Sequence, residues 1–220
     1  MKANHVIVLG LGTFGAAVAR RLTENKVRVT GVDIDEERVT ELQDVLFEAL
    51  VADATDPRTV EQLPVEKADA VVVSLGEDFA RSTLACLHLL EANARRIVAK
   101  VVTPDHKKIL AKLGVNDLVF PEVEIAEQWA DRITWPNVLF RLITETQQEI
   151  LEIGVPESLV GKTLKDADLR RRYGVLVIGI KNARKDTNYR FSPSPDTVLT
   201  DEDVLLVVGD PQGVAQLREL

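Results

Sequence analysis

Cysteine and histidine are scarce in this chain of 220 residues. Cys86 is the one cysteine, so no disulfide can form within the chain, and the leucines around it predict a buried, inert thiol. The three histidines, His5, His88 and His106, are far apart, and none has the spacing to Cys, Asp or another His that metal ligands show. No G-x-S-x-G segment is present either. The sequence therefore offers no recognisable catalytic set.

Long apolar runs and an excess of positive charge are also missing. No apolar run approaches the roughly 18–20 residues that cross a bilayer, and Lys2 leads straight into the first predicted strand without a secretory pattern. The net charge of −8 argues against a nucleic-acid partner, which would require a basic face. We expect a cytoplasmic protein with no transmembrane segment of its own.

A glycine-rich turn is the most informative feature of the sequence. The apolar run Val6–Leu9 precedes Gly10, Gly12 and Gly15 in the spacing G-x-G-x-x-G, and residues 16–22 continue with helical character. In a strand–turn–helix unit the first glycine allows the turn, the second lets the backbone approach a diphosphate, and the third lets the helix lie close to the sheet. The unpaired amides at the start of that helix stabilise a phosphate.

An acidic residue strengthens this interpretation. A second apolar run, residues 27–32, ends at Asp33, 23 residues after Gly10. A carboxylate there accepts hydrogen bonds from ribose hydroxyls and repels a 2′-phosphate, which favours NAD or an adenosine nucleotide over NADP. The alternative is a Rossmann-like unit that has lost its ligand. The register of strand, glycines, helix and acid favours a working site.

Strands and helices alternate through the first 120 residues. Strands are predicted at 5–10, 27–33, 47–52, 70–75, 97–102 and 117–120, and helices at 13–25, 36–46, 56 onward, 78–92 and 105–113. Because the strands are uninterrupted apolar runs, they predict an α/β fold with a parallel sheet buried on both faces. Right-handed crossovers then give a Rossmann-like, doubly wound sheet of strand order 3-2-1-4-5-6.

The second part of the chain follows a different pattern. Residues 122–133 predict an amphipathic helix, Pro136 breaks it, and a second helix is predicted from Val138 to Thr146. From about residue 149 the pattern predicts a small α+β lobe. We therefore divide the chain into a Rossmann-like lobe (1–135), a connecting helix (136–148) and the α+β lobe (149–220).

The segment 122–146 carries more apolar surface than a linker needs. We predict that it is an arm that packs on another subunit. Packing on its own sheet is the alternative.

In a doubly wound sheet, ligands bind beyond the carboxyl ends of the strands. Asp53 and Thr55 lie where an adenine edge would be read, and residues 74–76 lie near the phosphates. Lys100 ends its strand and is available to a terminal phosphate or to a neighbouring carboxylate; a solvated lysine is the alternative. The predicted nucleotide site comprises Gly10, Gly12, Thr13, Phe14, Gly15, Asp33, Ile34, Asp53, Ala54, Thr55, Ser74, Leu75, Gly76 and Lys100.

Several segments together resemble one family. They are VLGLGTFG (8–15), VDID (32–35), ADAT (52–55), STL (82–84), KLGV (112–115), LVGKTL (159–164), RYGV (172–175) and DVLLVVG (203–209). With these segments the chain resembles the cytosolic regulatory subunits of bacterial potassium uptake systems, the KtrA/TrkA family of RCK proteins. The first lobe then corresponds to TrkA-N and the last to TrkA-C.

The resemblance implies a sensor that is not an enzyme. Family members bind ATP, ADP or NAD(H) in the first lobe, form dimers that build octameric rings, and gate a separate potassium-translocating membrane subunit, so the chain would lie at the inner face of the membrane. Some members bind cyclic di-AMP at the interface between their second lobes. Some also coordinate a divalent cation through a glutamate at the position of Glu122, for which a helix-opening surface carboxylate is the alternative.

One residue departs from the family pattern. Members that discriminate ATP from ADP commonly carry arginine where this chain has Thr13. Threonine cannot offer a positive charge to a γ-phosphate, so control by ATP through that contact is not expected.

Two other classes of function remain open from the sequence. An NAD-dependent oxidoreductase would need a substrate site and an acid/base residue, for which a second lobe of about 70 residues offers little. A scaffold with a vestigial pocket would bind no nucleotide.

Overall fold

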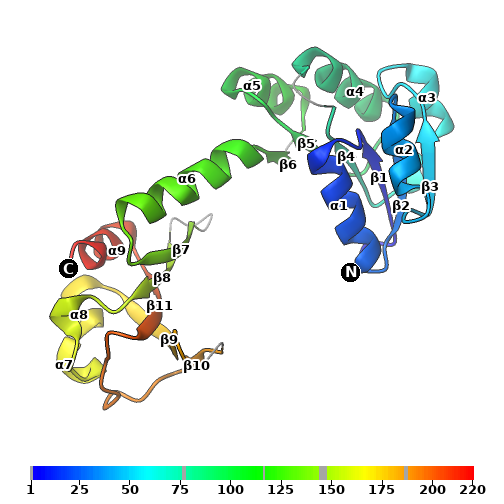
Figure 1. The fold of residues 1–220 in the computed structure, drawn as a ribbon. Helices are drawn as coiled ribbons and strands as arrows, with labels where there is room; N and C mark the ends of the chain where they lie inside the picture. The colour runs from blue at the N-terminus through cyan, green and yellow to red at the C-terminus, as the bar shows by residue number, and fades with distance from the viewer. Residues whose placement is uncertain (1, 76–77, 116, 144–147, 186–187) are drawn as a thin grey trace. The chain divides into compact units, whose positions relative to one another are not determined.

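The structure is a computed structural model that describes residues 2–75, 78–115, 117–143, 148–185 and 188–220 (Figure 1). Contacts within the chain divide it between Pro121 and Glu122 into two units. Each unit has its own apolar core. We therefore describe the two units separately.

The aliphatic runs of the first unit form a six-stranded parallel sheet. Its strand order, β3-β2-β1-β4-β5-β6, confirms the prediction (Figure 1). The strands are β1 (His5–Leu9), β2 (Arg28–Asp33), β3 (Glu48–Val51), β4 (Ala70–Val73), β5 (Ile97–Lys100) and β6 (Asp117–Val119).

Helices cover both faces of this sheet, because two separate apolar layers form on it. The layer on one face includes Ala19 of α1 and Leu42 of α2. The layer on the other face includes Cys86 of α4 and Leu110 of α5. The helices are α1 (Thr13–Glu24), α2 (Glu36–Leu42), α3 (Pro57–Gln62), α4 (Phe79–Glu91) and α5 (Pro104–Leu113), with a 3₁₀ turn at Val65–Lys67. Burial raises the pKa of the Cys86 thiol to about 12, as its predicted inertness requires.

The second unit begins at Glu122, the second residue of helix α6 (Pro121–Thr134), and continues as a small antiparallel sheet with short helices. The order of its sheet is β10-β9-β11-β8-β7. The strands are β7 (Val138–Ile143), β8 (Glu149–Gly154), β9 (Leu176–Asn182), β10 (Arg190–Phe191) and β11 (Asp203–Gly209). The helices are α7 (Leu164–Ala167), α8 (Leu169–Tyr173) and α9 (Pro211–Arg218), with a 3₁₀ turn at Glu157–Leu159. The α+β character of this part is as predicted.

The predicted connecting helix over 136–148 is wrong where the structure describes it. Val138–Ile143 is strand β7, which pairs antiparallel with β8 from Val138↔Ile153 to Ile143↔Glu149. The apolar spacing of this segment suits a helix, but ladder pairing with β8 decides its conformation. Residues 144–147, including Thr146 at the predicted helix end, lie outside the described residues.

A partly buried ion-pair network attaches the end of α6 to this sheet. Arg141 on β7 donates Nη2 to Glu149 Oε1 at 2.7 Å and Nε to Glu149 Oε2 at 2.9 Å. Its Nη1 donates to Asp131 of α6 at 3.0 Å. Glu149 is only 2% exposed, and this guanidinium donates to both of its carboxylate oxygens.

Arg141→Met is expected to destabilise the second unit by about 3 kcal/mol, because the Glu149 carboxylate would remain buried without its partner. Trp129 and Trp135 both lie after residue 121, so tryptophan fluorescence during urea unfolding reports the second unit. Arg184→Gln, which removes an exposed pair with Glu202, is the control and should cost less than about 1 kcal/mol. Equal midpoints for the two variants would contradict the prediction.

Candidate functional site

Two of the three loop glycines are required by the protein's own backbone. Gly10 follows β1 with a φ of +92°, and a Cβ there would lie 2.1 Å from the carbonyl oxygen of Ser74. A Cβ on Gly15 would lie 1.8 Å from the carbonyl oxygen of Gly10. The glycine loop therefore packs closely against the end of β4, and the start of α1 packs closely against the loop, as the spacing predicts.

Gly12 is different, because no other described part of the chain crowds it. Its φ of −65° suits any residue, and a Cβ at this position would have Arg38 Nη1, at 3.8 Å, as its nearest neighbour. Gly12 is also the N-cap of α1, where no side chain accepts a hydrogen bond from the helix amides and no acidic residue occupies the first turn. The loop therefore presents open backbone and the positive end of a helix to the cavity.

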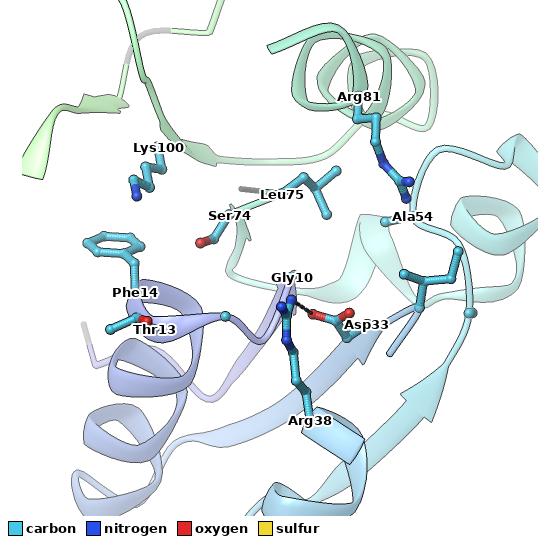
Figure 2. A pocket seen from close by; sticks show the side chains of 13 residues that line it. Gly10, Thr13, Phe14, Asp33, Arg38, Ala54, Ser74, Leu75, Arg81 and Lys100 are labelled. Atoms are coloured by element: carbon cyan, nitrogen blue, oxygen red, sulfur yellow. Dashed lines mark ion pairs between the residues drawn. The ribbon is translucent and has the colours of Figure 1, made fainter. Parts of the chain in front are cut away.

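Asp33 joins this loop to the end of β2. Its side chain is 5% exposed. Oδ2 accepts a hydrogen bond from the Leu11 amide at 2.6 Å, and Oδ1 accepts one from the Asp35 amide at 2.9 Å. The guanidinium of Arg38 approaches the same carboxylate, with Nη1 3.6 Å from Oδ2 (Figure 2). Asp33 thus faces the glycine loop and is held there by the protein's own groups.

A cavity of about 370 Å³ opens over this loop at the carboxyl ends of the strands (Figure 2). Most of the predicted site residues line it. These are Gly10, Gly12, Thr13, Phe14, Asp33, Ile34, Ala54, Ser74, Leu75 and Lys100.

Three predicted residues support the cavity without lining it: Gly15, Asp53 and Thr55. Asp53 Oδ1 accepts hydrogen bonds from the amide and the hydroxyl of Thr55 at 2.9 and 2.7 Å. These bonds, followed by the nearby Arg81, lower the pKa of the Asp53 carboxyl against the opposing effect of its burial. Gly76, also predicted, lies outside the described residues.

Sequence reasoning missed three lining residues: Arg38, Ala52 and Arg81. Arg38 lies in the first turn of α2 and pairs with Asp35 through Nε at 3.3 Å. Arg81 lies in the first turn of α4 and pairs with Asp53 at 3.0 Å. Their positions in the sequence could have indicated both arginines, because each occupies the first turn of a helix that follows a strand end at the site.

Positive charge is spread along the cavity. Figure 2 shows Lys100 above the ring of Phe14 and near Ser74, while Arg81 reaches from α4 toward the loop that carries Ala54. Arg38 lies between these ends, beside Asp33. Cationic side chains along a cavity suit a ligand that carries phosphate groups.

No cluster of three or more His, Cys, Asp or Glu side chains in the described part of the chain could hold a metal ion. Glu122 lies in the first turn of α6, where a carboxylate favours the helix dipole. Its role in cation binding stays a prediction.

His106 is a buried polar group of the first unit. It lies in the first turn of α5, is 1% exposed, and neither ring nitrogen has a hydrogen-bond partner among the described residues. Its ring packs against Phe79 at the start of α4, with centroids 6.1 Å apart. Burial lowers the pKa of His106 from its ordinary value of 6.5, so the folded protein favours the neutral imidazole.

Two domain-family models match most of this chain. The family model for the TrkA-N domain matches residues 6–121, and that for the TrkA-C domain matches residues 149–220. The Ktr system potassium uptake protein C of Bacillus subtilis (strain 168) is 32% identical over 212 residues, covering 96% of this chain and 95% of that protein. The Ktr system potassium uptake protein A of Vibrio alginolyticus is 31% identical over 208 residues, covering 94% and 93%.

A solved structure of the GsuK channel bound to NAD has the same fold over the whole of this chain. The TM-score is 0.69 with 21% sequence identity, and the match covers 39% of that channel's chain. No helix in the described residues is both long and apolar enough to cross a membrane.

Lowering the pH from 7.5 to 5.5 is expected to destabilise the first unit, and His106→Leu is expected to flatten this dependence. Because the folded-state pKa is depressed, the unfolded chain binds a proton that the folded chain does not; stability is present above pH 6.5 and is lost as the pH falls below it. One such group contributes at most about 1.4 kcal/mol per pH unit.

Amide hydrogen exchange in β4 and β5 measures this stability. The pKa of His5 is also lowered, first by burial and then by Arg28, so His5→Asn measured alongside separates the two contributions. An unchanged pH slope in the His106→Leu variant would contradict the assignment.

Proposed function

Because this chain belongs to the family defined by the TrkA-N and TrkA-C domains, we propose that it is a cytoplasmic regulatory subunit that senses a nucleotide and gates a potassium-translocating membrane protein. Its relatives of similar length include Ktr potassium uptake proteins. The ligand is an adenine nucleotide, and the GsuK channel, which shares the fold, binds NAD. The protein acts through binding and carries out no reaction.

The open face of Gly12 carries this proposal. Gly10 and Gly15 are glycines because backbone atoms crowd them, whereas among the described residues other than its chain neighbours the nearest atom to a Cβ at Gly12 is Arg38 Nη1, at 3.8 Å. A glycine that the fold does not need, at the loop position that a diphosphate approaches, is explained by a ligand. A vestigial pocket would be filled by side chains, but this one is an open cavity of about 370 Å³.

The lining also supports a choice among nucleotides. Position 13 offers a hydroxyl where ATP-selective relatives offer arginine, so a diphosphate such as ADP or the NAD(H) middle fits the loop better than a triphosphate. The oxidoreductase alternative gains no support from the histidines, because none of the three is among the described residues that line the cavity.

Gating requires that the nucleotide bind one conformation more tightly than another. A tenfold preference corresponds to about 1.4 kcal/mol per site, and a ring of subunits combines several such sites. We propose a homodimer that builds an octameric ring, as in the family that the chain resembles. Cyclic di-AMP at the second unit and a divalent cation at Glu122 remain further predictions.

Helix α6 is the proposed contact between subunits. None of its residues is buried, and Ile125, Trp129 and Ile133 are 53%, 57% and 77% exposed on one stripe. The predicted arm, 122–146, must be shortened to this helix, because Val138–Ile143 is a strand within the second unit.

Gly12→Ala is expected to preserve the fold and to weaken nucleotide binding by at least about tenfold, because the added methyl group clashes with none of the described residues but occupies the diphosphate approach. Isothermal titration with ATP, ADP, NAD⁺ and NADH measures the binding, and thermal unfolding measures the fold. Gly15→Ala is the matched variant and should instead unfold the first unit, since its Cβ would lie 1.8 Å from a carbonyl oxygen. A Gly12→Ala protein that binds all four ligands like the parent would refute the site.

Trp129→Glu is expected to shift the protein toward monomers by at least about tenfold in the dissociation constant, because it places a charge in the centre of the exposed stripe. Light scattering measures the mass. Ala130→Glu adds the same charge at the next residue, off the stripe, and should retain the oligomer. A parent protein that is monomeric, or equal effects of both variants, would contradict the interface.

A further inference from the structure

A guanidinium lies in the part of the cavity where a ribose is expected. Arg38, from the first turn of α2, lines the cavity, and its Nη1 lies 3.6 Å from Oδ2 of Asp33. The same nitrogen lies 3.8 Å from the position of a Cβ on Gly12. In a dinucleotide-binding unit the adenosine ribose meets the carboxylate after the second strand, and the diphosphate meets the second glycine. Figure 2 shows Arg38 reaching from α2 to this point beside Asp33.

The carboxylate of Asp33 presents little of its surface to a ligand. It is 5% exposed, and each of its oxygens already accepts a backbone hydrogen bond, Oδ2 from the Leu11 amide at 2.6 Å and Oδ1 from the Asp35 amide at 2.9 Å. The side chain of Arg38 is 52% exposed. Of these two opposite charges, the guanidinium is therefore the one that an incoming ribose meets first.

Arg38 keeps hydrogen-bond donors for a ligand. Its Nη1 lies 3.6 Å from Asp33 and its Nε lies 3.3 Å from Asp35, and both distances are longer than an ordinary N–H···O hydrogen bond. Nη2 takes part in neither ion pair. The planar guanidinium is thus held in place by charge and can still donate two parallel hydrogen bonds to a phosphate.

This arrangement alters the expected preference at the 2′ position of the ribose. A carboxylate that faced the ligand alone would repel a 2′-phosphate, whereas an arginine nearby accommodates one. Here the charge of Asp33 is balanced by a guanidinium 3.6 Å away, and the guanidinium is the more exposed partner. The local charges therefore favour a phosphate at this position.

We infer that Arg38 is a specificity-determining residue that binds a 2′-phosphate on the adenosine ribose, so that the site accepts NADP(H) as well as NAD(H). This inference rests on the proposed nucleotide site. It replaces the expectation, drawn from Asp33 alone, that a 2′-phosphate is repelled. The class of ligand then includes adenine nucleotides that are phosphorylated at the 2′ position.

The test compares two pairs of ligands that differ only at the 2′ position: NAD⁺ with NADP⁺, and AMP with adenosine 2′,5′-bisphosphate. The second pair has no diphosphate, so it isolates the ribose end of the site. Isothermal titration gives the dissociation constants for the parent, Arg38→Gln, Arg38→Lys and Arg81→Gln. Arg81→Gln is the matched control, because it removes the same charge from another part of the same cavity.

We expect the parent to bind the two members of each pair within about threefold of one another, because the guanidinium compensates the charge of the phosphate. Arg38→Gln should weaken the 2′-phosphorylated member by at least about tenfold relative to its counterpart, since charge-assisted hydrogen bonds are lost. Arg38→Lys should be intermediate, because an ammonium group keeps the charge without the planar pair of donors. Arg81→Gln should leave the ratio within each pair unchanged, and thermal unfolding should show that all variants fold.

Three results would overturn the inference while leaving the nucleotide site intact. The first is a parent that binds NAD⁺ and AMP but rejects their 2′-phosphorylated counterparts. The second is an Arg38→Gln variant that weakens both members of a pair by the same factor, which would assign the guanidinium to groups that the two ligands share. The third is an equal change of the ratio in Arg81→Gln, which would indicate a general effect of charge. Failure of the parent to bind any of the four ligands would overturn both the inference and the proposed site.

Discussion

The hydrogen bond from the Leu11 amide to the buried carboxylate of Asp33 holds the candidate site together. It is 2.6 Å long and joins the turn after β1 to the end of β2. With this hydrogen bond in place, Gly10 packs against the backbone at the end of β4, and Gly15 packs against Gly10. The first amides of α1 then face the cavity. A charged acceptor on a loop amide is among the stronger hydrogen bonds available to a protein. Asp33 therefore stabilises the glycine loop itself, independently of any ligand contact.

The local charges at the site differ from the overall charge of the protein. The protein is acidic overall, with a net charge of −8, yet its cavity is lined by Arg38, Arg81 and Lys100. Arg38 lies beside Asp33 and Arg81 pairs with Asp53, so each aspartate at the site faces a guanidinium. Net charge describes long-range behaviour, whereas ligand recognition depends on such local pairs.

The second unit shows how one helix can be anchored and still expose an apolar stripe. The far end of α6 is held by the pair between Asp131 and Arg141, and just beyond it the Trp135 indole donates to Glu219 while Arg218 lies 4.2 Å from the centre of its ring. These contacts fix the end of the helix to the sheet and to α9. They use none of the stripe around Trp129, which leaves that surface available for association.

The sequence by itself determined the parallel sheet, its strand order and the glycine loop, because these follow from local periodicity and from backbone geometry that only glycine satisfies. Only the tertiary structure decided that Val138–Ile143 is a strand, since pairing with β8 outweighs a spacing that also suits a helix. The same holds for Arg38 and Arg81, whose roles depend on which aspartate lies across the cavity. The spacing of apolar residues along a segment depends only on that segment. The partner of a long arginine side chain instead depends on which residues the fold brings within its reach.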